Sequence, residues 1–304
     1  MKVLVAGATG TVGVPMVEQL IAQGHQVVAL TRNEQAAARQ REAGNEAVVA
    51  DALDRDGLLR AVDGLAADAV IHQLTALRKA PTRYSLLNPT NRLRDVGTTH
   101  LLAAADVIGA KRFVVQSFFG GYGYAEHGQL PLTEAAEFGV PTGGPIDPVM
   151  AALRSAEDQV RGSTTVHGVA LRYGLFYSGG ELPEQVRKRA IPVARHGGGV
   201  LPMLHHEDAA SAAVAALTAG SAGAVYNIAD DQPATWTEVF TAMAGALGAP
   251  PPRALPNWLL RLAAPLAAVM MCDTVLSLDT SAARRELNWT PRYPTYREGL
   301  RSLG

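Results

Sequence analysis

Residues 1–13 read Met-Lys-Val-Leu-Val-Ala-Gly-Ala-Thr-Gly-Thr-Val-Gly, a short apolar run that leads directly into three spaced glycines. Residues 2–6 predict a strand, and residues 12–23 carry apolar side chains at helical spacing. A glycine-rich turn between a strand and a helix is typical of dinucleotide-binding sites, where glycine permits the tight turn and the approach of a pyrophosphate. A purely structural turn is the alternative. We predict that the pyrophosphate contacts Gly7, Thr9, Gly10, Thr11 and Val12.

The segments that follow alternate between strand-like and helix-like patterns as far as residue 175. Runs of β-branched residues predict strands at residues 2–6, 26–31, 46–50, 68–72, 112–117 and 165–172. Amphipathic or alanine-rich stretches predict helices at residues 12–23, 33–43, 90–108 and 149–160. Such alternation builds parallel βαβ units. The predicted fold class is therefore α/β, with a doubly wound parallel Rossmann sheet.

The pattern changes after Gly174, where glycine and proline become frequent. Helices are predicted at residues 182–188, 207–219 and 235–247, and a strand at 224–228 is expected to return to the main sheet. We therefore divide the chain into a dinucleotide-binding Rossmann domain, residues 1–175, and a smaller C-terminal lobe, residues 176–304, that mainly binds substrate. The apolar stretch 258–271 is interpreted as a buried helix or a pocket wall, with a partner or membrane face as the alternative.

The composition bounds the class of protein and its partners. The 304 residues are 48% apolar and 18% charged with a net charge of −1, which fits a globular protein and argues against nucleic-acid or anionic-membrane partners. The single cysteine, Cys272, excludes a disulfide framework, argues against a cysteine-based metal site and suits a reducing cytoplasm. We expect a cytoplasmic monomer or homodimer that has no bound metal and acts on a small molecule.

The end of the second predicted strand bears on the choice of cofactor. NAD-binding domains usually place an acidic residue there for the ribose 2′-hydroxyl, whereas this chain has Arg32. A guanidinium pairs with a 2′-phosphate, so we predict NADP, with NAD as the alternative. Asp51 and Ala52 follow the third strand, and Leu74 and Thr75 follow the fourth. We expect all four beside the cofactor, because ligands of open α/β sheets bind at the carboxyl ends of strands.

Several segments resemble the extended short-chain dehydrogenase/reductase superfamily, also called the NAD-dependent epimerase/dehydratase family. Besides the glycine motif, the resemblance rests on Asp51-Ala52-Leu53-Asp54, Leu171–Tyr177, His205-His206-Glu207-Asp208-Ala209, Tyr226-Asn227-Ile228 and Arg285–Pro291. It covers nearly the whole chain. It implies a nicotinamide cofactor and a catalytic Tyr-x-x-x-Lys pair, with a serine or threonine at the end of strand five, in which the lysine lowers the tyrosine pKa.

The expected catalytic helix departs from that family pattern. Either Val149 and Leu153 or Met150 and Arg154 occupy the Tyr and Lys spacing, so neither register supplies the tyrosine. The family serine falls at Phe118, with Ser117 one position early, and the family's helix-four asparagine falls at Arg94. The resemblance therefore predicts an atypical member that lacks the Tyr-x-x-x-Lys pair.

The loop after strand five holds the candidate replacements. Tyr124, Glu126 and His127 can each move protons and are expected above the nicotinamide end of the cleft. Arg154 is able to replace the lysine only as a fixed charge, because guanidinium does not deprotonate in proteins. We take Tyr124, His127 and Ser117 as the catalytic candidates, with packing or loop roles as the alternative for each.

The adjacent pair His205 and His206 suggests a metal site, but neighbouring side chains point apart and the sequence shows no third ligand at a suitable spacing. One of them is interpreted as lining the substrate pocket.

We therefore predict an NAD(P)-binding oxidoreductase that acts on a small hydrophobic or aromatic substrate with a non-standard proton donor. The alternatives are an isomerase, cyclase or dehydratase without net redox chemistry, and an NADP-sensing binding protein.

Overall fold

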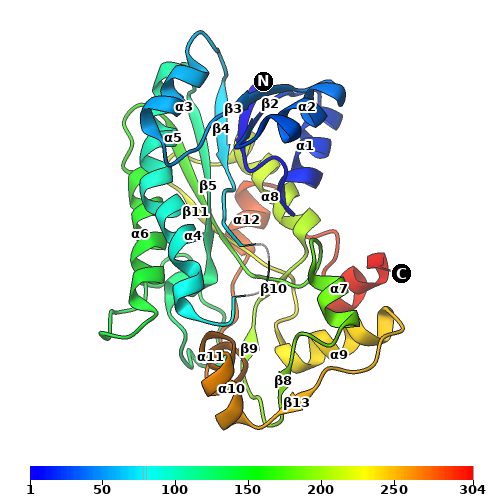
Figure 1. Ribbon diagram of the computed structural model, residues 1–304. Coiled ribbons are helices and arrows are strands. Elements are labelled where there is room, and N and C mark those ends of the chain that lie inside the picture. Colours follow the sequence, from blue (N-terminus) through cyan, green and yellow to red (C-terminus); the bar gives the residue numbers. More distant parts are fainter. Residues whose placement is uncertain (78, 80, 304) are drawn as a thin grey trace.

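A seven-stranded parallel sheet forms the centre of the computed structural model, which describes residues 1–77, 79 and 81–303. The strand order is β11-β6-β5-β4-β1-β2-β3, and the order reverses between β1 and β4 (Figure 1). The doubly wound parallel α/β fold predicted from the sequence is therefore confirmed. The strands are β1 Lys2–Ala6, β2 Gln26–Thr31, β3 Glu46–Val49, β4 Ala69–His72, β5 Arg112–Phe118, β6 His167–Tyr173 and β11 Val225–Ile228.

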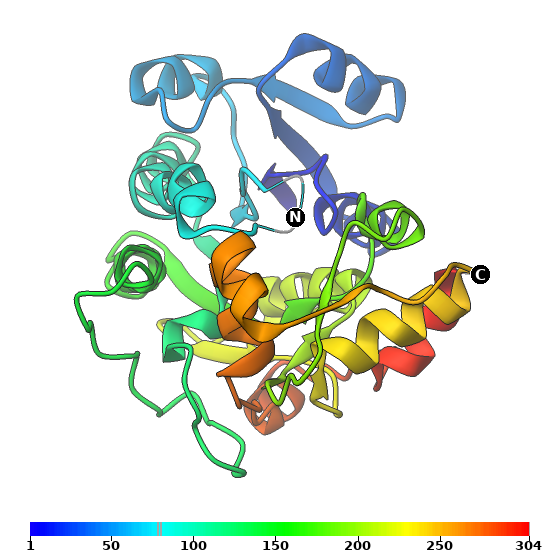
Figure 2. The ribbon, with the colours of Figure 1, turned by 60° about the horizontal axis from the view of Figure 1, so that its bottom comes forward.

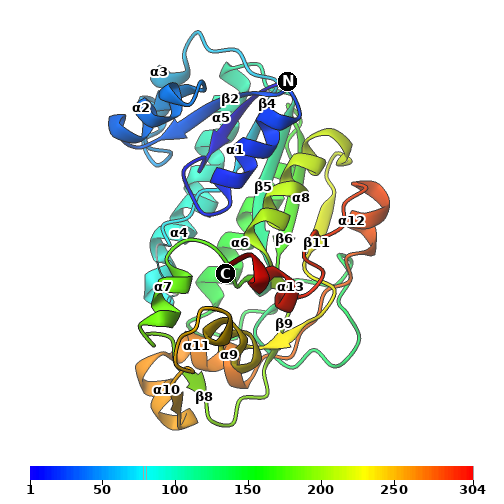
Figure 3. The same cartoon turned by 90° about the vertical axis from the view of Figure 1, so that its right-hand side faces the viewer.

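Helices cover both faces of this sheet (Figure 3). On one face α1, Gly13–Ala22, packs against α8, His206–Ala219, and their apolar side chains share a core with β1 and β6. The other face carries α3, Arg55–Val62, α5, Thr98–Val107, and α6, Asp147–Arg161. Because both faces are covered, the strands can be continuous apolar runs, and residues 3–6 of β1 are fully buried.

Local capping explains several element boundaries. Asn33 accepts the Ala36 N–H and starts α2, Glu34–Glu42, while Asp54 accepts the Gly57 N–H and starts α3. The predicted helix at 90–108 is instead three consecutive pieces, of which the middle one is a π-helical turn. These are α4 Asn88–Arg92, η2 Leu93–Gly97 and α5. The extra residue in the π turn turns Leu93 and Arg94 inward, where both are buried.

The C-terminal part of the chain contributes to the sheet and also builds a cap over its carboxyl edge. β11 pairs with β6 in parallel register, and α8 packs beside α1, whereas the remaining elements gather at one end of the sheet (Figure 2). Those elements are β7 Leu175–Phe176, α7 Leu182–Arg187, β8 Val193–Ala194, β9 Val200–Leu201, β10 Met203–Leu204, β12 Ala234–Thr235, α9 Trp236–Ala246, β13 Ala254–Leu255, α10 Asn257–Ala263 and α11 Pro265–Cys272.

Three further 3₁₀ turns and two short helices are present: η1 Tyr84–Leu87, η3 Phe119–Tyr122, α12 Ser281–Glu286, α13 Tyr296–Leu300 and η4 Arg301–Leu303. Within the described ranges, no helix has the length and apolarity needed to cross a bilayer.

The apolar stretch 258–271 is two short helices, not one buried helix. Pro265 opens α11, and the chain breaks at Ala264 because proline cannot continue a preceding helix. Trp258 and Leu262 on α10 are exposed, whereas Leu266 and Met270 on α11 line the cavity described below. The interpretation of this stretch as a pocket wall therefore holds for α11, whereas no residue of α10 lines the cavity.

Candidate active site

A cavity of about 580 Å³ lies at the carboxyl edge of the sheet, beneath the C-terminal cap. Its lining includes every residue that the sequence predicts to contact the cofactor: Gly7, Thr9, Gly10, Thr11, Val12, Arg32, Asp51, Ala52, Leu74 and Thr75. These residues come from four successive strand ends, so the topology brings them together where the strand order reverses.

The turn between β1 and α1 accepts only glycine at two of its positions. Gly7 has φ +102°, and a Cβ there would lie 2.9 Å from the carbonyl oxygen of Gln73. A Cβ on Gly13 would lie 2.0 Å from the Gly7 carbonyl oxygen. The glycines thus permit both the tight turn and the close packing of α1 on the sheet. The resulting bare cradle at a helix N-terminus fits a pyrophosphate.

A second glycine segment lies directly against this turn. A Cβ on Gly179 would come within 2.5 Å of Thr11 Cγ2, and one on Gly180 within 2.8 Å of Thr11 Oγ1. Ser178 fixes the segment, because its hydroxyl pairs with His206 Nδ1 at 2.8 Å and accepts the His206 backbone N–H. The phosphate end of the cavity is therefore enclosed from both sides.

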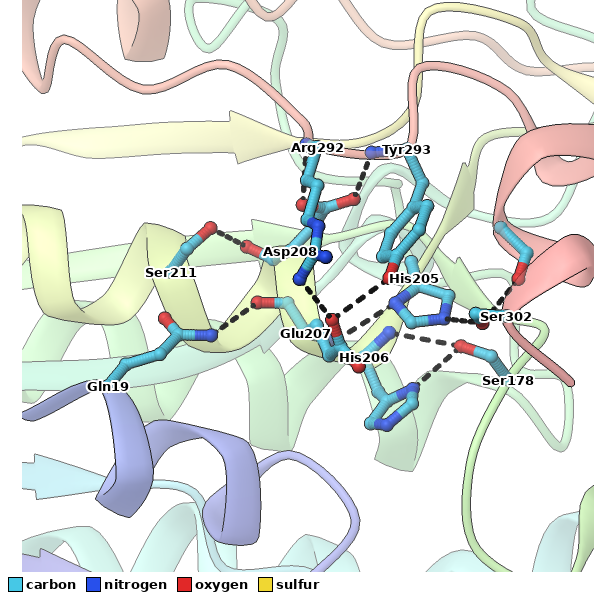
Figure 4. A network of polar contacts seen from close by, with 11 residues as sticks. Gln19, Ser178, His205, His206, Glu207, Asp208, Ser211, Arg292, Tyr293 and Ser302 are labelled. Atoms are coloured by element: carbon cyan, nitrogen blue, oxygen red, sulfur yellow. Dashed lines mark hydrogen bonds and ion pairs between the residues drawn. The ribbon is translucent and has the colours of Figure 1, made fainter. Parts of the chain in front are cut away.

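The start of α8 anchors this segment through the polar network of Figure 4. Asp208 accepts the backbone N–H groups of Arg292 and Tyr293 at 2.7 and 3.0 Å, and Gln19 donates to the Glu207 carbonyl. Burial lowers the pKa of His205 to about 3, so this histidine is neutral. Among the described residues no three His, Cys, Asp or Glu side chains could hold a metal, and neither histidine lines the cavity.

The adenosine end of the cavity lies at β2 and β3. Arg32 follows β2 and is exposed to the cavity. Asp51 Oδ1 accepts the Leu53 N–H at 2.9 Å, which fixes the carboxylate at the cavity wall. An exposed guanidinium at this end of the cavity fits a ribose that carries a 2′-phosphate.

The opposite end of the cavity lies at β5, α6 and β6. Ser117 lines it, but its hydroxyl donates to Glu157 Oε1 at 2.6 Å. Glu157 is fully buried and pairs in bidentate fashion with Arg172, at 2.9 and 2.8 Å. Burial alone would lower the pKa of Arg172, and the Glu157 carboxylate more than offsets this, so the pKa is raised. The Ser117 hydroxyl hydrogen is therefore bound by a carboxylate that belongs to a buried ion pair, and does not point to a substrate.

α6 contains neither tyrosine nor lysine along Asp147–Arg161. Val149 faces the cavity and Leu153 belongs to the buried core, so this register points toward the cleft. Arg154 instead is exposed and stacks over Phe138, 4.8 Å from the ring centre, outside the cavity lining. The hypothesis that Arg154 supplies a fixed charge in the cleft is therefore wrong.

The two remaining catalytic candidates lie in different places. Tyr124 lines the cavity, and burial raises the pKa of its hydroxyl while the nearby Arg94 charge lowers it, so the phenol stays protonated. His127 is outside the lining, with Nε2 3.2 Å from the Gly123 carbonyl. Tyr122, in the same loop, is buried and donates its hydroxyl hydrogen to Asn227 Oδ1 at 2.7 Å.

Several cavity residues were not predicted from the sequence. Arg94, Lys79 and Gln116 supply polar groups, whereas the apolar wall includes Leu87, Phe118, Trp236, Phe240, Leu266 and Met270. The sequence did contain a hint that Arg94 belongs to the site, because Arg94 stands at the position of the family's helix-four asparagine. The sequence contained no such hint for Trp236 and Phe240 on α9, since only long-range packing brings this helix to the cleft.

Comparisons with known proteins agree with this geometry. The family model described as "NAD dependent epimerase/dehydratase family" matches residues 3–229. One relative, the 3-diazoavenalumate denitrifying reductase of a Streptomyces species, is 37% identical to this chain over 311 positions. The match covers 99% of this chain and 99% of the relative.

Two further matches lie at greater distance. The 2-alkyl-3-oxoalkanoate reductase of Stenotrophomonas maltophilia is 28% identical over 82% of this chain and 77% of its own length. Among solved structures, the UDP-glucose 4-epimerase of Thermus thermophilus in complex with NAD superposes with a TM-score of 0.75 at 23% identity, covering 99% of this chain and 97% of that one. The structural match supports the fold.

Proposed function

Because the chain belongs to the NAD-dependent epimerase/dehydratase family, we propose that it is an NADPH-dependent reductase whose small aromatic substrate accepts hydride without a Tyr–Lys proton relay. The observation that carries the proposal is the contrast within one cavity. The dinucleotide half has its glycine cradle, whereas α6 contains neither tyrosine nor lysine and places Val149 in the cavity wall.

An aryl diazo group fits such a site. When bound, NADPH would supply a hydride; addition of this hydride to the outer nitrogen of an aryldiazonium would give an aryldiazene, which would lose N2 as its hydrogen moves to the ring carbon. Charge and electrons balance in these two steps without a proton from the protein, so the reaction does not need a tyrosine as proton donor. The similarity to a denitrifying reductase of a diazo compound supports this substrate class. The apolar wall of Phe118, Trp236 and Phe240 would enclose an aromatic ring.

NADPH is proposed over NADH because Arg32 lies at the cavity end of β2, where an acidic residue would favour NAD. Calorimetry on wild type and Arg32→Ala tests this choice. NADPH affinity should fall about tenfold or more in the variant, as expected for losing a charge-assisted contact, while NADH affinity stays unchanged. Equal effects on both cofactors would contradict a 2′-phosphate contact.

A second candidate function, reduction of a carbonyl with Tyr124 as proton donor, is favoured by the protonated phenol in the cavity wall. The similarity to an oxoalkanoate reductase points the same way. The variant Tyr124→Phe separates the two functions. It should leave reduction of an aryldiazonium within about threefold of wild type, whereas carbonyl reduction through Tyr124 would fall by a factor of roughly 10² or more.

The test is consumption of NADPH with a panel of aryldiazonium salts and aryl ketones, followed at 340 nm beside an enzyme-free control. Faster oxidation with the diazonium compounds, equal in amount to the arene formed, supports the main proposal. Oxidation with ketones alone supports the second. Tight NADPH binding without oxidation by either class would favour the isomerase or NADP-sensing alternatives.

A further inference from the structure

Arg94 is a buried cation at the cavity wall. It lies in the π-helical turn η2 and is 7% exposed. Its Nη1 donates a long hydrogen bond of 3.4 Å to Asn91 Oδ1, and its Nε has no partner among the described residues. No Asp or Glu of the described chain lies within ion-pair distance of it. Burial lowers the pKa of Arg94 to about 10, so the guanidinium remains charged at neutral pH.

A charge in this position is costly unless an anion meets it. In the case of the buried Arg172, the Glu157 carboxylate compensates the charge by a bidentate ion pair. Arg94 has no such carboxylate. The orientation of its side chain follows from its neighbours, because it lines the cavity and its charge acts on the Tyr124 hydroxyl.

The charges of the cavity lining are unevenly distributed. Asp51 lies at the adenosine end beyond β3, and Glu181 precedes α7 beside the glycine segment. Around the ends of β4 and β5 the charged lining residues are Lys79 and Arg94, both cationic. The two nucleotide phosphates belong to the glycine cradle at the other end. The half of the cavity left for substrate is therefore positive.

We propose that Arg94 is the receptor for a carboxylate on the substrate, so that the enzyme acts on aromatic carboxylates. Apolar side chains of the same cavity lining, Phe118, Leu266 and Met270, would hold the hydrocarbon body while the guanidinium fork binds both carboxylate oxygens. This inference rests on the proposed function for the reacting group, and adds the group by which the substrate is selected.

The test uses binding without turnover. The protein is saturated with NADP⁺ at pH 7.5, and trans-cinnamate and its neutral isostere cinnamamide are titrated by calorimetry. Wild type should bind the carboxylate about 10- to 100-fold more tightly than the amide. Arg94→Gln should bind both with equal affinity, and Arg94→Lys should keep part of the preference, since lysine offers charge without the fork.

Arg92→Gln is the matched control, because Arg92 carries the same charge two residues away and is exposed outside the cavity lining. It should behave as wild type. Equal binding of the two probes to wild type, or an undiminished preference in Arg94→Gln, overturns the proposal. A preference lost in Lys79→Gln but kept in Arg94→Gln also overturns it.

Loss of NADP⁺ affinity in Arg94→Gln with the carboxylate preference intact would make Arg94 a cofactor contact and would equally overturn the proposal. Because these measurements need no chemical step, a failure of the proposed reduction leaves their result readable. Thermal unfolding of each variant shows that it is folded. Removal of a buried unpaired charge should leave the melting temperature of Arg94→Gln equal to or above that of wild type.

Discussion

Replacement of Glu157 by glutamine should be among the most damaging single changes away from the glycine turn. The carboxylate is fully buried and holds three hydrogen bonds, one from Ser117 and two from Arg172. The amide keeps the shape but removes the charge, which leaves a guanidinium uncompensated at 4% exposure. Arg172 Nη1 already lacks a partner among the described residues, so no spare acceptor replaces the loss.

The expected cost is about 3–5 kcal/mol of unfolding free energy, the range measured for breaking a buried ion pair by removing one partner. Equilibrium urea unfolding followed by circular dichroism measures it. Ser117→Ala removes one hydrogen bond to the same carboxylate but leaves the ion pair, so its cost should be about 1–2 kcal/mol. The double variant Glu157→Gln/Arg172→Met should recover much of the loss, because no buried charge remains unpaired.

A loss below about 1 kcal/mol in Glu157→Gln would refute this reasoning, since it would mean that water or a rearranged acceptor satisfies Arg172. A double variant no more stable than Glu157→Gln alone would refute it as well. In that case packing around the pair, and not the unpaired charge, would carry the cost.

Three further predictions concern the turn and two buried titratable groups. Gly13→Ala should weaken NADPH binding at least tenfold by calorimetry, because its Cβ would lie 2.0 Å from the Gly7 carbonyl oxygen and must displace the turn; an unchanged affinity would contradict this. Burial lowers the pKa of His72 to about 4, below the value in the unfolded chain, so the free energy of unfolding should fall by up to about 3 kcal/mol as the pH drops from 6.5 to 4. In urea unfolding of His72→Gln, this dependence of the unfolding free energy on pH should be absent. The same pH dependence in the variant and the wild type would refute the assignment. Burial and the Asp208 charge raise the pKa of Asp230 to about 8, so the wild type should lose stability as the pH rises from 4 to 8. Asp230→Asn should match wild type at about pH 4 and melt higher at pH 9, and a lower melting temperature of the variant at pH 9 would count against the assignment.

The sequence predicted the strands of the parallel sheet well, because strands buried on both faces are short apolar runs and the glycine turn marks the end of the first strand. Element ends moved by one or two residues, as at the start of α2, where Asn33 caps the helix and lies outside it. The predicted long helix at 90–108 is present as consecutive helical pieces from Asn88 to Val107, but its π turn was not predicted, since such a turn arises from packing and leaves no periodic signal. That turn is what carries Arg94 inward.

The cofactor end of the site was predictable and the substrate end was not. Residues such as Thr9 and Asp51 directly follow strands, so topology alone places them together. The partner of Ser117 lies 40 residues away on α6, and the cavity wall at Trp236 and Met270 depends on how distant helices fold back. Local sequence carries no information on such contacts, which explains why Ser117 was assigned to chemistry when its hydroxyl serves Glu157.

The central claim is that hydride passes from the bound nicotinamide to a substrate in this cavity. The most direct test supplies NADPH deuterated at C4 in each of its two configurations, together with an aryldiazonium carboxylate, and examines the NADP⁺ formed by mass spectrometry. We predict that the NADP⁺ loses its deuterium when one of the two cofactors is used and keeps it with the other, with one arene formed for each NADPH consumed. Deuterium lost or kept alike from both cofactors, or arene formed without NADPH consumption, would contradict the claim.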